Sequence, residues 1–259
     1  MNDTIKRSSL LLCCFFLLTA TAHKAHAQWD PNALRNYQLS MPRVSKAYSL
    51  YNEKLRAEFT QKGFQYPPKN IYLRSFKAHN ELEVWVKNDG VDTYALFKTY
   101  KICALSGSLG PKRWEGDLQV PEGLYFIADF NPNSDFYLSM LVNYPNYSDL
   151  VLGNKQTPGG DIYIHGGCVT VGCLPMTDAG IQEIYTLCLN ARMNGQTNIP
   201  VHIFPVRFNR VGLNFLGKAY ENDETKQRFW INLKAAYDHF EKNHKLFPVM
   251  YNEEGKYVF

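Results

Sequence analysis

The hydrophobic pattern of the chain changes from a period of two to a helical period near residue 176. Between residues 70 and 103, Leu82, Val84 and Val86 alternate with charged residues, and the turn signal at 88–90 leads into a second run. This pattern predicts two strands joined by a hairpin turn. Short apolar runs separated by Gly, Pro, Asn and Ser predict further strands over 123–130, 136–143, 161–165 and 201–208.

Apolar residues at helical spacing predict three helices, over residues 46–63, 177–195 and 223–244. Thr177 is the candidate N-cap of the second helix. Residues 28–44 contain two prolines and little periodicity, so we expect a linker there, and residues 249–259 are expected to form a final hairpin. Many short strands followed by a few helices predict an α+β protein.

The first 27 residues have the features of a secretory signal peptide. Lys6 and Arg7 precede an apolar stretch, and Ala25-His26-Ala27 matches the small-x-small cleavage pattern. The alternative is an uncleaved membrane anchor, but the stretch is shorter than the roughly 20 residues that span a bilayer. We therefore expect cleavage near Ala27, a mature chain without a transmembrane segment, and a periplasmic location.

The charge and the motifs of the chain argue against several classes of ligand. The formal charge is +4, and removal of Lys6, Arg7, Lys24 and Asp3 would leave +2, which is too small to indicate a nucleic-acid partner. No spacing typical of a metal site and no glycine-rich phosphate loop is present. We expect neither a metal nor a cofactor.

The segment from Asp161 to Asp178 contains the candidate chemistry. His165 ends a predicted strand and is followed by Gly166 and Gly167, and Cys173 follows Gly172 immediately before the predicted helix. A cysteine nucleophile needs a thiolate, which an adjacent imidazole and a helix N-terminus favour. The imidazole in turn needs a partner that fixes its tautomer, and the Gly166 carbonyl is a candidate.

Attack on an amide also creates an oxyanion, which backbone N–H groups can stabilise. The N–H groups of Gly172 and Cys173 are the candidates here. We therefore predict a catalytic set of Cys173 as nucleophile, His165 as base, and Gly166 and Gly172 as the glycines that shape the site.

The motif His165-Gly166 followed by Thr170-x-Gly172-Cys173 resembles the signature of L,D-transpeptidase catalytic domains of the YkuD fold. The longer match through Cys173-Leu-Pro-Met-Thr-Asp178, together with segments such as 110–112, 121–125 and 144–146, is similar to the YafK-like branch. The resemblance covers roughly residues 71–259. It implies a β-rich, sandwich-like catalytic domain with flanking helices and a C-terminal helical extension.

The residue patterns and the resemblance together predict the domain order, and the resemblance implies the substrate. We expect a signal peptide at 1–27, an N-terminal linker and helix at 28–69, the catalytic domain at 70–210, and the helical extension packed on it at 211–259. The implied substrates are peptidoglycan stem peptides, with a wall-linked lipoprotein as a further candidate partner. Candidate substrate contacts are Lys112, Tyr125, Tyr144 and Thr170.

Two positions depart from the wider family pattern. Val171 stands where many members have a histidine, and Pro175 stands where many have an arginine that is thought to hold a substrate carboxylate. The departure leaves open whether the acyl group passes to an amine or to water. Similar enzymes of this branch are associated with hydrolysis that releases lipoprotein from the wall rather than with cross-linking. The alternative function for this chain is therefore a hydrolase that trims stem peptides or releases wall-linked lipoprotein.

The sequence alone leaves several alternatives to this interpretation open. A Cys168–Cys173 disulfide would block the nucleophile, and the remaining cysteines, Cys103 and Cys188, allow other pairings. Pairing of Cys173 with His202 would match the residue order of papain-like and NlpC/P60-like peptidases. A non-catalytic peptidoglycan-binding module is the last alternative.

Overall fold

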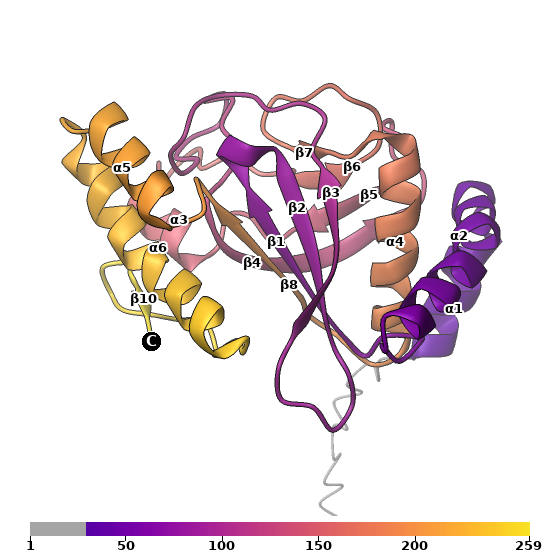
Figure 1. Ribbon diagram of the computed structural model, residues 1–259. Coiled ribbons are helices and arrows are strands. Elements are labelled where there is room, and N and C mark those ends of the chain that lie inside the picture. Colours follow the sequence, from indigo (N-terminus) through magenta and orange to yellow (C-terminus); the bar gives the residue numbers. More distant parts are fainter. Residues whose placement is uncertain (1–29) are drawn as a thin grey trace, which may run out of the picture. The chain divides into compact units, whose positions relative to one another are not determined.

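The computed structural model describes residues 30–259, of which residues 31–259 form one compact unit (Figure 1). The predicted signal peptide lies outside the described residues. Within them, no helix has the length and apolar character needed to cross a bilayer. The domain boundaries expected at residues 69 and 210 fall inside the compact unit and remain predictions.

Eight strands form one mixed sheet in the order β3-β2-β1-β8-β4-β5-β6-β7. Neighbouring strands are antiparallel except for the pairs β1–β8 and β6–β7, which are parallel. The strands are β1 (Asn70–Phe76), β2 (Glu81–Lys87), β3 (Ala95–Lys101), β4 (Gly123–Asn131), β5 (Ser139–Val142), β6 (Tyr163–His165), β7 (Leu174–Pro175) and β8 (Ile199–Phe204). A separate C-terminal hairpin pairs β9 (Met250–Tyr251) with β10 (Tyr257–Val258), as predicted.

Helices cover both faces of the sheet, so the α+β class is confirmed (Figure 1). The helices of the described residues are α1 (Pro31–Ser40), α2 (Pro42–Gln61), α3 (Tyr147–Leu152), α4 (Thr177–Met193), α5 (Arg210–Ala219) and α6 (Glu224–Asn243), with a short 3-10 turn at Lys77–His79. Helices α1, α2 and α4 pack together, and α4 contacts strands β1, β5, β6 and β8. Figure 1 shows α5 and α6 on the opposite side of the sheet.

The adjacent parallel strands β1 and β8 lie inside the sheet and bury both of their faces, although Arg74, Ser75 and His202 interrupt their apolar residues. On β8, Val201 and Ile203 belong to the core beneath α4, whereas Phe204 belongs to the core beneath α6. Because strand side chains alternate, His202 also faces the α6 side. The alternation divides the apolar interior into two layers.

A buried arginine attaches α6 to the sheet. Arg74 on β1 donates to Glu83 on β2 at 2.8 Å and to Glu241 on α6 at 2.5 Å. Its guanidinium lies 4.9 Å from the ring centroids of both Trp85 and Phe240. Two carboxylates and two aromatic rings compensate the desolvation of this charge, which an unpaired arginine could not tolerate.

The prediction of a linker over residues 28–44 is wrong, because α1 occupies 31–40 and α2 begins at Pro42. Pro31 and Pro42 stand at first helical positions, where the missing N–H has no cost. Gln38 of α1 is buried, donates to the carbonyl of Phe130 and accepts from Tyr185. These contacts join residues far apart in sequence, so local periodicity could not reveal the helix.

Candidate active site

Strand pairing brings His165 and Cys173 to the same face of the sheet. In the parallel pair β6–β7, Ile164 lies beside Leu174 and His165 beside Pro175. By the same register Cys173 falls beside Tyr163, and side chains at positions 163 and 165 share one face. Ile164 belongs to the core beneath α4, so His165 and Cys173 point the other way.

The two side chains line one pocket of about 180 Å³, here called the Cys173 pocket. Its remaining lining residues are Phe136, Val169, Thr170 and Val171. Val169 and Val171 are 64% and 74% exposed, so the rim is apolar and open. Of the predicted site residues, His165, Thr170 and Cys173 therefore meet at one opening.

The imidazole of His165 is held in one tautomer. Its Nδ1 lies 2.5 Å from the carbonyl oxygen of Gly166. A carbonyl can only accept, so Nδ1 carries the proton and Nε2 is left as the basic nitrogen. The ring of Phe136 packs against the imidazole with centroids 4.6 Å apart. The predicted partnership with the Gly166 carbonyl is confirmed.

Burial lowers the pKa of His165 below its ordinary value, and the hydrogen bond to Gly166 partly opposes this effect. The imidazole is therefore neutral at neutral pH and ready to accept a proton. Burial also raises the pKa of the Cys173 thiol, although the Tyr163 N–H and the charge of Lys112 act in the opposite direction. The resting pair is a thiol and a neutral imidazole.

The Cys173 sulfur is engaged by the backbone of the neighbouring segment. The N–H of Tyr163 donates to Sγ at 3.4 Å, and Sγ lies 3.5 Å from the carbonyl oxygen of Asp161. The first contact favours a thiolate, whereas the second is available only to the protonated thiol. In this arrangement the thiol proton points to Asp161, so transfer to His165 requires the S–H group to turn about the Cβ–Sγ bond of Cys173.

Thr170 organises the turn that carries the nucleophile. Its Oγ1 accepts from the N–H groups of Gly172, at 3.2 Å, and Cys173, at 2.8 Å, and donates to the carbonyl of Cys173 at 2.9 Å. The two N–H groups predicted to be free for an oxyanion are thus already bonded inside the turn. The sequence offered no sign of this role beyond the spacing of Thr170 to Cys173.

Gly166 and Gly172 stand where a side chain has no room. A Cβ at Gly166 would lie 2.7 Å from both the carbonyl oxygen of Phe136 and a carboxylate oxygen of Asp178. Gly172 has φ +134, a conformation that favours glycine, and a Cβ there would lie 3.1 Å from the carbonyl oxygen of Gln119. Both glycines allow neighbouring backbone to close around the site.

Asp178 is a residue of the site whose role could not be predicted from the sequence. Its carboxylate accepts from the Gly167 N–H at 2.8 Å and so fastens the turn after His165 to the first turn of α4. The predicted start of that helix at Thr177 is confirmed, but the prediction of Thr177 as N-cap is wrong, because the N-cap is Met176 and Thr177 is the first helical residue. The hydroxyl of Thr177 nevertheless accepts from the Gly180 N–H within the first turn. Strand β7 separates Cys173 from the helix, contrary to the expectation of direct succession.

A disulfide joins Cys103, just after β3, to Cys168, with Cα atoms 5.6 Å apart. The alternative of a Cys168–Cys173 disulfide is therefore wrong, and Cys173 is a free thiol of intermediate burial. Cys188 is also free, but it is fully buried in α4, and burial raises its pKa to about 12. Of these two free thiols, only that of Cys173 opens to a pocket.

Three of the predicted substrate contacts belong to the interior instead. Lys112 pairs with Asp117 at 2.6 Å, Tyr125 donates to Asp149 at 2.9 Å, and Tyr144 donates to the carbonyl of Pro158 at 2.8 Å. All three side chains are buried, and none lines the Cys173 pocket. This corrects the prediction, because groups already bonded within the protein are not presented to a ligand there.

His202 cannot serve as the partner of Cys173. Strand β8 is separated from β7 by β4, β5 and β6, which places the two strands roughly 19 Å apart at about 4.8 Å per step. The ring of His202 is buried, and its Nδ1 lies 3.0 Å from the hydroxyl of Tyr72. Burial lowers its pKa to about 3. The papain-like alternative is therefore wrong.

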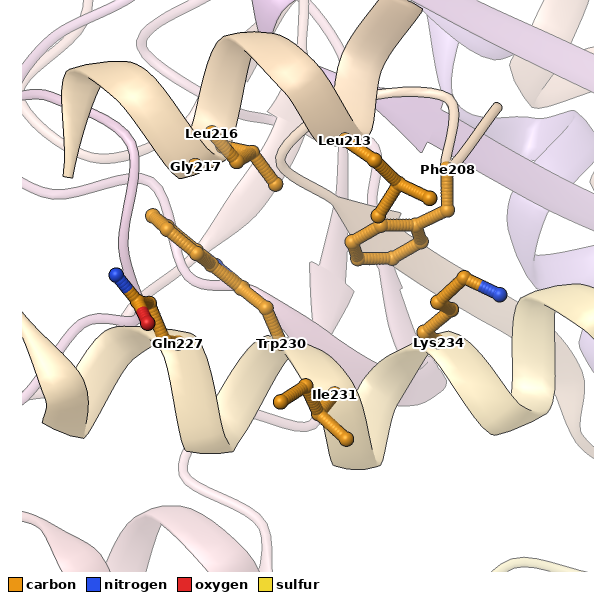
Figure 2. Close-up of a pocket in the computed structure, with 8 residues that line it drawn as sticks. All are labelled: Phe208, Leu213, Leu216, Gly217, Gln227, Trp230, Ile231 and Lys234. Carbon is orange, nitrogen blue, oxygen red and sulfur yellow. The ribbon is translucent and has the colours of Figure 1, made fainter. Parts of the chain in front are cut away.

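A second pocket, of about 170 Å³, lies between α5 and α6 (Figure 2). Figure 2 shows the rings of Phe208 and Trp230 between the two helices, with Leu213 and Leu216 projecting from α5. Lys234 at its edge pairs with Asp238. Apart from Lys234, whose charge is paired, the lining offers no nucleophile and no general base, and we assign this pocket to the packing of the two helices. Within residues 30–259, no group of three or more His, Cys, Asp or Glu side chains is arranged to hold a metal ion.

Comparison with known proteins agrees with this geometry. The profile of the YkuD family, the L,D-transpeptidase catalytic domain, matches residues 75–203. The protein named "Putative L,D-transpeptidase YafK" from Escherichia coli strain K12 is 36% identical over 190 residues, which are 73% of each chain. Its counterpart from strain O157:H7 matches equally.

Two solved structures show weaker likeness. The helical cell shape determining protein Pgp2 from Campylobacter jejuni is 23% identical, with a TM-score of 0.42 over 53% of this chain and 48% of that one. Bd1075 from Bdellovibrio bacteriovorus is 20% identical, with a TM-score of 0.38 over 69% of this chain and 71% of that one. Likeness at this level supports no conclusion about function.

Proposed function

Because the chain belongs to the L,D-transpeptidase catalytic-domain family, which acts on peptidoglycan, we propose that it is a periplasmic cysteine acyltransferase for peptidoglycan stem peptides. The observation that carries the proposal is the Cys173 pocket, where a free thiol and an imidazole of fixed tautomer share one opening. An apolar, partly closed site also strengthens the polar interactions made inside it.

The first half of the reaction forms a thioester. His165 Nε2 takes the proton of Cys173, and the sulfur attacks the carbonyl carbon of an L,D-amide in the stem peptide. The Tyr163 N–H, which already points at Sγ, stabilises the thiolate. The tetrahedral oxyanion competes with Thr170 for the N–H of Cys173. Collapse breaks the C–N bond, and the leaving amine receives the proton from His165.

The second half of the reaction passes the acyl group to an acceptor. An amine or a water molecule gives its proton to His165, attacks the thioester carbonyl and expels the Cys173 thiolate, which is then reprotonated. An amine acceptor gives a cross-link or a tethered protein, and water gives a trimmed peptide or a freed lipoprotein.

Hydrolysis is the second candidate activity, and one observation favours it. Pro175 is buried in β7, and the pocket rim consists of valines, so the pocket lining offers no cation to hold the carboxylate of an incoming peptide. A water molecule has no carboxylate, so it can act as acceptor without such a cation. The two activities share the acyl-enzyme and differ only in the acceptor.

The Cys103–Cys168 disulfide supports a location outside the cytoplasm. Disulfides persist in oxidising compartments such as the periplasm, and a reducing cytosol would open this one. The signal peptide expected over residues 1–27 would deliver the chain there.

The test is mass spectrometry of muropeptides after incubation with wild-type protein, Cys173→Ser and Cys188→Ala. We expect the wild type and Cys188→Ala to alter the muropeptides and Cys173→Ser to leave them unchanged. Cys188→Ala is the matched control, because it removes the other free thiol without touching the pocket. New 3-3 dimers identify transpeptidation, whereas trimmed tripeptides or freed lipoprotein identify hydrolysis.

A non-catalytic module predicts a different result. Wild-type protein with reduced Cys173 would then bind muropeptides, leave them intact and acquire no adduct with a carbapenem. That combination would overturn the proposed function.

A further inference from the structure

An exposed tryptophan stands on the loop before β4. Trp114 is 54% exposed. A large apolar side chain left in water forgoes the stabilisation that its burial would give, so an exposed tryptophan is a candidate for contact with a ligand. The residue lines a cavity of about 260 Å³, here called the Trp114 cavity, which also takes in Arg113, Asp117, Gln119, Lys226 and Phe229. The cavity lies between the 110–119 loop and the first turn of α6.

The turn that presents Trp114 is rigidly built. The buried carboxylate of Asp117 accepts from the backbone N–H groups of Arg113, Trp114 and Gln119 and from Lys112. Lys112 also donates to the carbonyl of Trp114 at 3.0 Å. The backbone on both sides of the indole is thus fixed before any ligand arrives, which lowers the entropic cost of binding.

The charged groups around the cavity compensate one another. Arg113 pairs with Asp149 at 3.3 Å, and Lys226 pairs with Asp223 at 3.1 Å. Asp117 is paired with Lys112. A cavity whose charges are already paired favours an uncharged ligand with many hydroxyl and amide groups over a free carboxylate or phosphate.

The same loop also borders the nucleophile. The carbonyl of Gln119 lies 3.1 Å from the position of a Cβ at Gly172, directly before Cys173. Burial raises the pKa of Cys173, and the charge of Lys112, which helps to fix the turn, opposes part of this rise. Gln119 therefore lines the Trp114 cavity and also approaches the residue next to the nucleophile through its carbonyl.

We propose that the Trp114 cavity binds a neutral pyranose ring of the glycan strand, stacked on the indole. A pyranose has an apolar face of C–H groups that suits an aromatic ring, and its rim of hydroxyl and amide groups suits Gln119, Arg113 and Thr225. The volume is roughly nine times that of one liquid water, enough for one sugar ring. The substrate would then be a stem peptide still attached to its glycan strand.

The inference that the substrate is a glycan-linked stem peptide rests on the proposed function, whereas binding of a sugar ring in the Trp114 cavity does not. The binding test titrates the full-length mature protein with a soluble β-1,4-linked N-acetylglucosamine tetramer and follows the indole N–H of Trp114 by NMR. We expect a saturable shift of that resonance in wild type and in Tyr37→Ala, and no saturable shift of any resonance in Trp114→Ala. Tyr37 is the matched control, since it is an aromatic residue on α1 that is 53% exposed.

The turnover test compares kcat/KM for glycan-linked and free stem peptides. We expect Trp114→Ala to lower kcat/KM for the glycan-linked form about tenfold, through KM, and to leave the free peptide within about twofold. Trp114→Phe, which keeps an aromatic face, should recover most of the loss. Tyr37→Ala should match wild type on both substrates.

The outcomes separate this inference from the proposed function. If wild type processes stem peptides but the tetramer causes no saturable shift and Trp114→Ala changes neither substrate, the sugar site is overturned and the proposed function stands. If wild type processes neither form of the stem peptide, the proposed function fails, and the tetramer titration alone decides the sugar site.

Discussion

The hydroxyl of Thr170 lies 2.8 Å from the amide nitrogen of Cys173 and accepts its hydrogen bond. The same hydroxyl donates to the carbonyl of Cys173 at 2.9 Å, so one side chain holds both polar groups of the nucleophile's backbone. Through this bond the turn that carries the thiol keeps its shape without a substrate. An acyl oxygen that uses this N–H must share it with Thr170 or displace Thr170.

The first prediction concerns Thr170→Val, which keeps the shape of the side chain and removes the hydroxyl. The substitution removes the hydroxyl that holds the Gly172 N–H and both backbone groups of Cys173. The turn then holds the thiol less firmly, and although the Cys173 N–H becomes free for the oxyanion, we expect acylation of Cys173 to slow by roughly 10- to 100-fold. Mass spectrometry of the adduct with a carbapenem over time measures the rate. Thr170→Ser retains the hydroxyl and should stay near wild type; equal rates for both variants would contradict the role.

The second prediction concerns pH. Burial raises the pKa of Cys173 and lowers that of His165, so the neutral thiol–imidazole pair dominates at neutral pH. The rate of alkylation by iodoacetamide should therefore rise with pH and reach its midpoint above 9.0, the ordinary value of the thiol. Cys173→Ser should take up no label, because Cys188 is buried. A midpoint below about 8 would instead indicate a thiolate–imidazolium pair.

The sequence sufficed where the evidence is local. Alternation at Leu82, Val84 and Val86 predicted β2, and apolar spacing predicted α4 and α6. The carbonyl partner of His165 could also be predicted, because Gly166 is the next residue and its backbone is always available. Contacts between residues that are neighbours along the chain can be predicted without knowing the fold.

The sequence failed where a partner comes from elsewhere. Tyr125 meets Asp149, 24 residues away, and so turns into the interior rather than toward a ligand. The pairing of Cys103 with Cys168 spans 65 residues, and four cysteines allow three connectivities. Such contacts depend on the order of strands in the sheet, and that order cannot be predicted from the local pattern of one sequence.

The third prediction tests the room around Gly166. Gly166→Ala places a methyl group 2.7 Å from the carbonyl of Phe136 and from the carboxylate of Asp178, so the backbone must shift. We expect a loss of about 1–3 kcal/mol in the free energy of unfolding and a large loss of Cys173 acylation. Gly160→Ala is the control, because its methyl group would meet nothing within 4 Å. Similar effects of both substitutions would show that crowding at Gly166 is not the cause.

The fourth prediction concerns His202, whose pKa burial lowers to about 3. The unfolded chain binds a proton at this residue below about pH 6.5 and the folded chain does not, so acidification favours unfolding. Between about pH 6 and pH 3 the stability of wild type relative to His202→Gln should fall by about 1.4 kcal/mol per pH unit, and below pH 3 the difference should level off. Urea unfolding of both proteins at several pH values measures the difference, in which the titration of other groups cancels. A difference that is constant with pH would mean that His202 is not buried in its neutral form.

The fifth prediction separates the stability of the site from its chemistry. The Cys103–Cys168 disulfide closes a long loop and holds the segment between His165 and Cys173 against the end of β3. Replacing both cysteines by alanine should lower the free energy of unfolding by about 3–4 kcal/mol, because the unfolded chain regains the entropy of the open loop. Urea unfolding measures this loss, and carbapenem adduct formation reports on Cys173 in the same samples.

We expect acylation to slow as well, because the turn after Gly167 loses its covalent anchor while the Thr170 bonds remain. Cys168→Ala alone leaves Cys103 unpaired and should lose the same stability. If the double variant keeps wild-type stability and acylation, the disulfide neither holds the fold nor supports the position of the nucleophile.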